Sequence, residues 1–307
     1  MAAPRPNTFL IGGPKCGTTS LAHYLSEHPD VFLGYPKEPS YWSSDLAQSG
    51  TVALVRSLND YLNIYSSAEG KKVVLDASTR YLFSKVAVRR IVEFNPKAKF
   101  IVILRNPIEA AYAYHMEKVF NHFEDEEDFE IAWKLQSRRL QGHSIPSGCD
   151  EPKELQYQQV ASFGSQLASV LEHVKRDDLL VLFTEDMASD ARGTYLKVLD
   201  FLDLEDDGRT DFKIKGGAHF NRFQALSRLY QNPPKVIRPV IRSLKQLIRR
   251  NFPLSWEYMI KKVLVTRKAR KPLSEEMRRD LASGFCEDVK LLEKVTGKDL
   301  RHWLDAS

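Results

Sequence analysis

The sequence predicts an α/β fold in which a parallel β-sheet is covered by helices on both faces, giving three layers. Short apolar runs, each followed by turn residues and then by a segment with helical periodicity, recur along the 307 residues. This alternation is typical of parallel sheets. The runs are continuously apolar, as at 100–104, which is expected for strands buried on both faces. No linker or internal repeat interrupts the chain, so we expect a single domain over 1–307, with a basic helical subregion at about 223–271 packed on it.

Each predicted element has its own signal in the sequence. The apolar runs predict strands at 8–11, 31–33, 72–75, 99–104 and 179–183. Helical periodicity predicts helices at about 18–26, 52–62, 84–93, 107–120, 129–141, 154–174, 190–202 and 274–296. The last helix has the clearest start, because Ser274 is a good N-cap and two glutamates follow it in the first turn. In such a sheet, ligands bind beyond the carboxyl ends of the strands.

The loop after the first strand has the composition of a phosphate-binding loop. Residues 12–19 read Gly-Gly-Pro-Lys-Cys-Gly-Thr-Thr and lead directly into a predicted helix. A strand that turns through glycines into a helix directs unpaired N–H groups and the positive end of the helix dipole at one point. The nucleotide-triphosphate loop G-x-x-x-x-G-K-[ST] would require a lysine where this chain has Thr18. The lysine stands at position 15 instead, so a ligand shorter than a triphosphate is favoured.

With the segments that follow, the chain resembles the sulfotransferases that use 3′-phosphoadenosine 5′-phosphosulfate. The matching segments are 28–33, Pro36-Lys37-Glu38-Pro39-Ser40-Tyr41-Trp42, Arg105-Asn106-Pro107, 183–187 and 272–304. Among these enzymes, the bacterial and Golgi-type carbohydrate sulfotransferases are the most similar. The resemblance covers nearly the whole chain and implies a P-loop-NTPase-like sulfotransferase fold.

The resemblance also implies roles for particular residues. Lys15 would neutralise the leaving phosphate oxygen, and Glu38 would accept the acceptor's proton as general base. Arg105 would bind the 3′-phosphate through its guanidinium group. The residues expected to bind the donor are Lys15, Cys16, Gly17, Thr18, Thr19, Ser20 and Arg105. No metal is expected, since the leaving phosphate ester carries its charge well. The acceptor is expected to be a hydroxyl, or less readily an amine, of a carbohydrate-like or other small molecule.

Two positions depart from the family's pattern. The serine that shares the 3′-phosphate in the family is Ala113 in this chain, and Ala110 replaces an arginine that is common there. The pocket would then use other side chains, for which Tyr112, Tyr114 and Lys215 are candidates. Ala77 stands where Golgi relatives often have a lysine, which weakens the case for a heparan-type acceptor.

Other readings of the sequence remain open at this point. His115 is a second candidate base, because related cytosolic sulfotransferases use histidine. Cys16 is a candidate reactive thiol beside a helix N-terminus. An ATP-dependent kinase would use Asp76, at the end of an apolar strand, to hold Mg²⁺. A catalytically degenerate nucleotide-binding module is the non-enzymatic alternative.

Composition limits the cellular setting and the partners. Three cysteines without metal-like spacing suggest neither a disulfide framework nor a zinc site, and they favour a reducing compartment. No run approaches the length of a transmembrane helix, and there is no room for a signal peptide before residue 7, so we expect a cytoplasmic, bacterial-type enzyme unless the chain is a trimmed catalytic domain.

The net charge of +5 is unevenly distributed. Residues 235–271 contain twelve Lys or Arg and one acid, Glu257. This stretch reads as a solvated helix face, a membrane-surface segment or a wall for an anionic substrate. No nucleic-acid-binding module is recognisable, so no nucleic-acid partner is expected. The oligomeric state is not indicated by the sequence.

Overall fold

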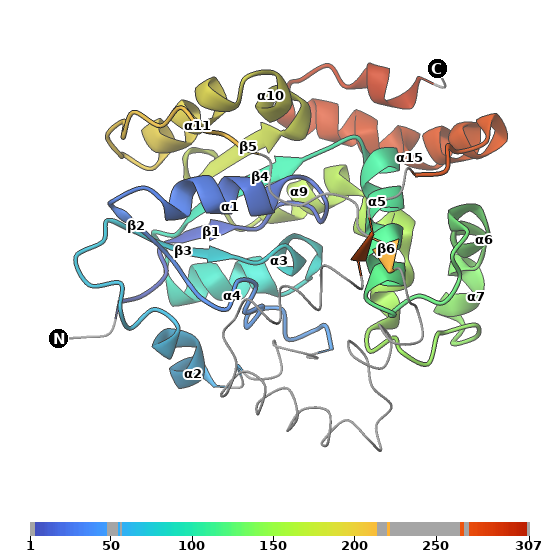
Figure 1. Cartoon of the computed structure of the whole chain (residues 1–307), viewed down its shortest axis with the longest axis horizontal. Helices are drawn as coiled ribbons and strands as arrows, with labels where there is room; N and C mark the ends of the chain where they lie inside the picture. The colour runs from blue at the N-terminus through green and yellow to red at the C-terminus, as the bar shows by residue number, and fades with distance from the viewer. Residues whose placement is uncertain are drawn as a thin grey trace. The chain divides into compact units, whose positions relative to one another are not determined.

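The computed structural model describes residues 4–47, 55, 57–213, 220–221, 265–266 and 270–305. Its centre is a five-stranded sheet in the order β2-β3-β1-β4-β5, in which every neighbouring pair is parallel. Helices surround this sheet, as Figure 1 shows. The predicted α/β class is therefore confirmed.

All five predicted strands of this sheet are present. They are β1 (Thr8–Leu10), β2 (Val31–Leu33), β3 (Val73–Ala77), β4 (Lys99–Leu104) and β5 (Leu179–Phe183). Every residue of β1 and β3 is buried, and five of the six residues of β4 are buried as well. The runs are therefore continuously apolar for the predicted reason: their strands are buried on both faces of the sheet.

The strand order reverses its direction at β1, which is the position where open parallel sheets generally bind ligands. In the register, Thr8 lies opposite Leu75 on β3 and opposite Lys99 on β4, so β1 is the middle strand. The chain leaves β1 toward β2 on one side and later continues through β4 to β5 on the other. A reversal of this kind opens a crevice at the carboxyl ends of the strands. The loops after β1, β2, β3, β4 and β5 meet at that edge.

The helices agree with the sequence prediction in four places. The helices α1 (Thr18–Ser26), α5 (Pro107–Phe120), α11 (Ala191–Phe201) and α15 (Glu275–Thr296) match the predicted ranges within a residue or so. Two more, α2 (Leu58–Asn63) and α4 (Ala87–Phe94), begin several residues later than predicted. Most of the predicted start of α2, at 52–56, lies outside the described residues. None of the helices in the described part of the chain is long and apolar enough to cross a membrane.

The predicted helix at 154–174 is wrong, because the structure divides it. A short 3₁₀ turn (Pro152–Leu155) is followed by α8 (Tyr157–Val160) and α9 (Phe163–Leu171). Asp288 of α15 accepts hydrogen bonds from the amides of Gly164 (2.8 Å) and Ser165 (2.9 Å). These amides are satisfied from another helix instead of from a preceding turn, so α9 can begin anew.

The predicted helix at 129–141 is also divided, and some elements were not predicted. It consists of α6 (Phe129–Lys134) and α7 (Gln136–Leu140), which meet at Leu135, where the backbone amide bonds to two carbonyls of the previous turn. The elements not predicted are α3 (Arg80–Phe83), α10 (Thr184–Ser189), the 3₁₀ turns Arg176–Asp178 and Arg301–Leu304, and the antiparallel pair β6 (Phe220–Asn221) and β7 (Val265–Thr266). Apart from β6 and β7, these are helical segments of three to six residues beside longer elements, and periodicity over a long window does not resolve such short segments.

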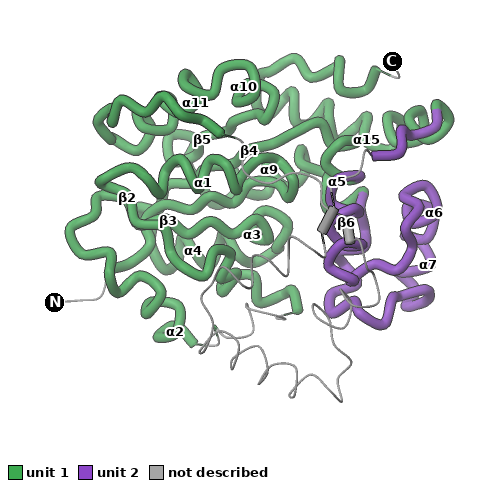
Figure 2. Tube along the Cα trace, viewed as in Figure 1, with its two compact units in different colours: residues 1–111, 158–216, 275–307 green, residues 112–157, 217–274 purple. Residues whose placement is uncertain are grey.

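The chain divides into two compact units, drawn in different colours in Figure 2. Unit 1 comprises 1–111, 158–216 and 275–307 and contains the five-stranded sheet. Unit 2 comprises 112–157 and 217–274. Most of the predicted basic subregion at 223–271 lies outside the described residues, and the single domain over 1–307 stays a prediction.

Candidate active site

The loop after β1 follows strand β4 closely. The amide of Ile11 donates to the carbonyl of Ile101 (2.9 Å), and that of Gly13 donates to the carbonyl of Ile103 (3.1 Å). A Cβ atom added at Gly12 would lie 2.5 Å from the backbone nitrogen of Ile103. Only glycine fits there, so the loop can leave the sheet edge without losing its pairing.

The same loop enters α1 with backbone donors that no described residue accepts from. Lys15 (φ 62°) and Gly17 (φ 92°) adopt left-handed conformations, and α1 begins at Thr18. The amides of Gly17, Thr18 and Thr19 meet no acceptor among the residues that the structure describes. Together with the helix dipole, these donors form a site suited to an anion. We call residues 12–19 the cradle.

Two of the residues expected to bind the donor, Cys16 in the cradle and Ser20 directly after it, are buried. Cys16 is fully buried, its thiol lies 3.4 Å from the carbonyl of Pro14, and burial raises its pKa well above the ordinary range of a thiol. Burial thus disfavours the thiolate form, which argues against Cys16 as a reactive thiol. Ser20 is buried as well, and its amide already donates to the carbonyl of Gly17 (3.0 Å).

Thr184, the first residue of α10, ties the cradle to two strand ends. Its hydroxyl lies 2.7 Å from the carbonyl oxygen of Cys16 and 3.0 Å from that of Leu104. One hydroxyl proton can serve only one of these acceptors at a time. The cradle, the end of β4 and the end of β5 are thereby held within one hydrogen-bonding group.

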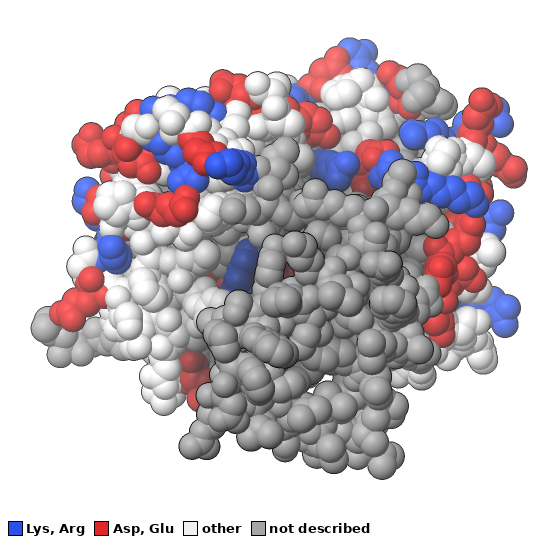
Figure 3. Space-filling view, viewed as in Figure 1, with Lys and Arg blue, Asp and Glu red and all other residues white. Residues whose placement is uncertain are grey.

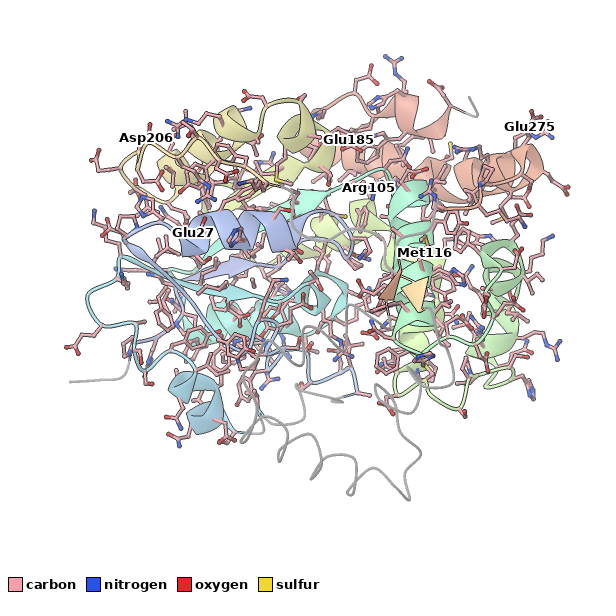
Figure 4. All side chains as sticks on the ribbon, viewed as in Figure 1. Glu27, Arg105, Met116, Glu185, Asp206 and Glu275 are labelled. Carbon is pink, nitrogen blue, oxygen red and sulfur yellow. The ribbon has the colours of Figure 1, made fainter. Side chains whose placement is uncertain are left out.

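Arg105 follows β4 directly, and its side chain pairs with an acidic residue. Its guanidinium lies 3.6 Å from the carboxylate of Glu109, one helical turn along α5, and the Arg105 side chain is 32% exposed. Glu185, at the start of α10, accepts a hydrogen bond from the amide of Asn106 (3.2 Å). Figure 4 labels Arg105 and Glu185 at the ends of their elements. Arg105 is thus held at the carboxyl edge of the sheet, partly exposed, where an incoming phosphate could replace Glu109 as its partner.

Of the side chains expected to replace the family's phosphate-binding serine, the structure describes two, Tyr112 and Tyr114. Ala113 lies within α5, as its sequence position requires. Tyr112 donates from its hydroxyl to the carbonyl of Lys271 (2.9 Å), and its ring faces the guanidinium of Arg270 at 4.6 Å. Tyr112 and Tyr114 belong to unit 2, and Lys215 lies outside the described residues. Their part in phosphate binding stays a prediction.

Glu38 lies in the turn after β2, on the same unit as the cradle. Its backbone is left-handed (φ 62°), and its side chain is 37% exposed. One carboxylate oxygen accepts from the ammonium of Lys37 (2.8 Å), and the other accepts from the hydroxyl of Thr79 (3.1 Å). The ammonium of Lys37 also lies 3.4 Å from the hydroxyl of Thr19 in α1. The structure therefore brings the predicted base to the predicted cradle, with Lys37 between them.

A buried hydrogen-bond network lies below the Glu38 turn. Asp76, at the carboxyl half of β3, accepts from the hydroxyls of Ser78 (2.7 Å), Tyr61 (2.8 Å) and Tyr81 (2.9 Å). Burial raises the pKa of Asp76 to about 6, although these hydroxyl donors counteract the rise. The Ser78 hydroxyl also accepts from the backbone amide of Ser40 (3.2 Å). The end of β3 thus supports both the backbone and the carboxylate of the turn after β2.

The hydrogen bonds that Asp76 accepts argue against its use as a Mg²⁺ ligand in an ATP-dependent kinase. Both of its carboxylate oxygens accept hydrogen bonds from protein hydroxyls, and the side chain is 1% exposed. A Mg²⁺ ligand beside a triphosphate needs an oxygen that faces the metal. Within the described ranges, no group of three or more His, Cys, Asp or Glu side chains could hold a metal ion.

His115 has a structural environment. It is 1% exposed, its Nε2 lies 2.8 Å from the carbonyl of Glu126, and burial lowers its pKa. Its ring packs beside Phe129 and Tyr157 within unit 2. These contacts suit a histidine that is packed in a core more than one that takes a proton from an acceptor.

Several residues that support the site had no predicted role. Lys37 and Thr79 contact Glu38, and Ser78 supports its turn. Thr184 and Glu185 bind the backbone of the cradle and of Asn106. Lys37, Thr184 and Glu185 lie within the segments that matched the family, and Ser78 and Thr79 directly follow β3. Position after a strand was therefore the available signal for their roles.

Comparison with known proteins agrees with this architecture. The model of the sulfotransferase domain family matches residues 5–232, and the chain belongs to this family. Mouse carbohydrate sulfotransferase 15 is 27% identical over 65% of this chain and 44% of its own length. The human bifunctional heparan sulfate N-deacetylase/N-sulfotransferase 1 is 29% identical over 37% of this chain and 13% of its own length. The chain thus spans less than half the length of these curated relatives.

A solved structure shows the same fold. The crystal structure of a sulfotransferase from Alicyclobacillus acidocaldarius aligns with a TM-score of 0.72 and 22% sequence identity, covering 98% of this chain and all of that one. The chain therefore has the P-loop-like α/β fold of the sulfotransferases.

Proposed function

We propose that the protein transfers a sulfuryl group from 3′-phosphoadenosine 5′-phosphosulfate to a hydroxyl, or less readily an amine, of a carbohydrate-like or other small-molecule acceptor. One observation carries the proposal: Lys37 contacts both the carboxylate of Glu38 and the cradle, whose backbone donors at 17–19 meet no acceptor in the described part of the chain. Membership of the sulfotransferase domain family supports the same chemistry. The names of the relatives support a carbohydrate acceptor.

The residues at this edge of the sheet fit the donor's phosphates. The amides of Gly17, Thr18 and Thr19 and the ammonium of Lys15 would bind the 5′-phosphate, and Arg105 would bind the 3′-phosphate. The donor supplies the sulfuryl group. Lys15 would stabilise negative charge on the leaving oxygen, an interaction that strengthens as the bond breaks.

Glu38 would take the acceptor's proton. Thr79 fixes one of its oxygens, and the side chain remains 37% exposed, so an acceptor can reach it from solvent. A positioned general base typically contributes a factor of about 10² to 10⁴ in rate. The alternative base, His115, belongs to unit 2, is 1% exposed and contacts the carbonyl of Glu126, so Glu38 is the preferred assignment.

Transfer of a labelled group tests this proposal directly. The protein is incubated with ³⁵S-labelled donor and a panel of desulfated glycosaminoglycans, simple sugars and phenols, and in parallel with γ-labelled ATP and Mg²⁺. We expect label from the sulfate donor in at least one acceptor, and none after Lys15→Ala. Transfer from ATP with none from the sulfate donor would establish the kinase alternative, and transfer from neither would favour the degenerate module.

A further inference from the structure

Lys37 occupies a position that the roles assigned so far do not explain. Its ammonium lies 2.8 Å from the carboxylate of Glu38 and 3.4 Å from the hydroxyl of Thr19. The side chain is 24% exposed, less than that of Glu38. Exposed ion pairs usually contribute little to stability. A role of the Lys37–Glu38 pair in the reaction is therefore considered instead of a role in stability.

The two contacts of Lys37 mark the two ends of the proposed reaction. Thr19 belongs to the cradle, which would hold the leaving phosphate oxygen. Glu38 would hold the proton of the attacking acceptor oxygen. Displacement at sulfur requires the attacking oxygen, the sulfur and the leaving oxygen to lie roughly in line. A cation within hydrogen-bonding reach of both ends would therefore lie beside the sulfuryl group during transfer.

The chemistry of an ammonium suits that place. It offers three donors, and the two described contacts use two of them. The sulfuryl oxygens are anionic acceptors, and charge-assisted hydrogen bonds to such groups are among the stronger ones in proteins. Lys37 lies between Pro36, whose ring fixes its own φ, and Glu38, whose backbone is left-handed, so both neighbours of Lys37 in the turn have a restricted backbone.

We propose that Lys37 is a further catalytic residue, which donates a hydrogen bond to an oxygen of the transferring sulfuryl group while it holds Glu38 in place. The inference rests on the proposed function. In the transfer, the bond from sulfur to the phosphate oxygen breaks and its electron pair stays on that phosphate. A bond from sulfur to the acceptor oxygen forms, and the acceptor's proton passes to Glu38. Lys37 remains an ammonium throughout.

The test uses the difference between donor and product. Adenosine 3′,5′-bisphosphate lacks the sulfuryl group, so a residue that contacts this group affects binding of the donor and leaves binding of the product alone. Lys37→Met keeps the length of the side chain and removes the charge, and Lys37→Arg keeps the charge. The dissociation constants of donor and bisphosphate are measured by calorimetry without acceptor, and kcat is measured with an acceptor found as above.

Lys72 supplies the matched control. It forms an ion pair with Asp30 (2.9 Å), and these two residues precede β3 and β2, at the opposite end of the strands from the cradle. For Lys37→Met we expect about tenfold to a hundredfold weaker binding of the donor and unchanged binding of the bisphosphate, as for loss of one charged hydrogen bond. We also expect a lower kcat, with partial recovery in Lys37→Arg. Lys72→Met should resemble the wild type.

Two outcomes would overturn the inference about Lys37. Equal weakening of donor and bisphosphate would mean that Lys37 only shapes the cradle. Unchanged donor binding and kcat would mean that the ion pair is incidental. The proposed function fails separately, if the wild-type protein binds neither nucleotide or transfers no sulfate.

Discussion

The carboxylate of Glu38 shows how single residues make this site. Its left-handed backbone is unusual for a residue with a side chain, and strained conformations persist where surrounding contacts fix them. Here those contacts come from Thr79 and Lys37. The two hydrogen bonds hold the Glu38 carboxylate beside Lys37, which in turn contacts Thr19 of the cradle.

Replacement of Glu38 by glutamine should separate catalysis from binding. Glutamine keeps the shape and can still accept from Thr79, but it is not a base. We expect kcat to fall by about 10² to 10⁴, with the affinity for adenosine 3′,5′-bisphosphate within about twofold of the wild type. Steady-state kinetics and calorimetry measure the two quantities. Glu69→Gln, at an exposed position of the same unit, is the control, and full activity in Glu38→Gln would remove Glu38 from the mechanism.

The buried carboxylate of Asp76 should make the free energy of unfolding depend on pH. Burial raises its pKa from 3.8 to about 6. The unfolded chain loses this proton near pH 4, whereas the folded chain keeps it until about pH 6. The stabilising contribution is therefore complete below pH 4 and is lost as the pH rises through 6. From pH 4 to pH 7 the loss amounts to about 2 kcal/mol.

Asp76→Asn removes this pH dependence. Relative to the wild type, we expect the free energy of unfolding of the variant to rise by about 2 kcal/mol from pH 4 to pH 7. Urea unfolding at pH values between 4 and 8 measures it. Asp177→Asn, at an exposed site, should run parallel to the wild type. Parallel curves for Asp76→Asn as well would show that the Asp76 carboxyl titrates normally.

At the scale of elements, the strands and the helix after the cradle follow directly from local sequence. Continuous apolar runs mark β1 to β5, and the run of glycines and threonines marks the start of α1. The interruption before α9 could not be predicted, since it depends on Asp288, more than 120 residues away in sequence. The same reason applies to the site: its motifs are local, but the contacts of Glu38 with Thr79 and of Thr184 with Cys16 join distant segments.

The helix break before α9 gives a prediction for stability. Asp288 acts as a cap from another helix, with bonds to the amides of Gly164 and Ser165. Asp288→Ala should lower the free energy of unfolding by about 1 to 2 kcal/mol, as for loss of an N-cap. Chemical denaturation measures the change, and Asp280→Ala on an exposed face of the same helix is the control. Equal effects of the two substitutions would assign no capping role to Asp288.

At the scale of the whole molecule, unit 2 is centred on a buried ion pair. Glu124 and Arg139 are fully buried, and two nitrogen–oxygen pairs join them at 2.7 Å each. Tyr157 adds a third hydrogen bond to Glu124 (2.5 Å). Burial by itself would raise the pKa of Glu124, but the hydrogen bonds from Arg139 and Tyr157 outweigh it and leave the pKa lowered.

Breaking this pair on one side should destabilise the protein strongly. Glu124→Gln leaves the charge of Arg139 buried without a counter-charge, and we expect a loss of about 3 to 5 kcal/mol in the free energy of unfolding. The double variant Glu124→Gln/Arg139→Met should recover much of it. Asp125→Asn, exposed next to the pair, is the control. A loss under about 1 kcal/mol for Glu124→Gln would mean that solvent reaches Arg139.

The distribution of charge on the surface is a property of the whole molecule. Figure 3 shows acidic and basic side chains interspersed over the described part of one face. The basic stretch at 235–271, expected to form a solvated face, a membrane contact or a substrate wall, lies almost wholly outside the described residues. Its role stays a prediction, as does the cytoplasmic location.

The most direct measurement is a calorimetric titration with adenosine 3′,5′-bisphosphate and with ATP, each with and without Mg²⁺. We expect tight binding of the bisphosphate that does not depend on the metal and that weakens by about tenfold or more in Lys15→Ala and in Arg105→Ala. Glu38→Gln should bind the bisphosphate with the affinity of the wild type. Preference for ATP with Mg²⁺, or binding of the bisphosphate unaffected by both substitutions, would contradict the assignment of the cradle and Arg105 as the donor site.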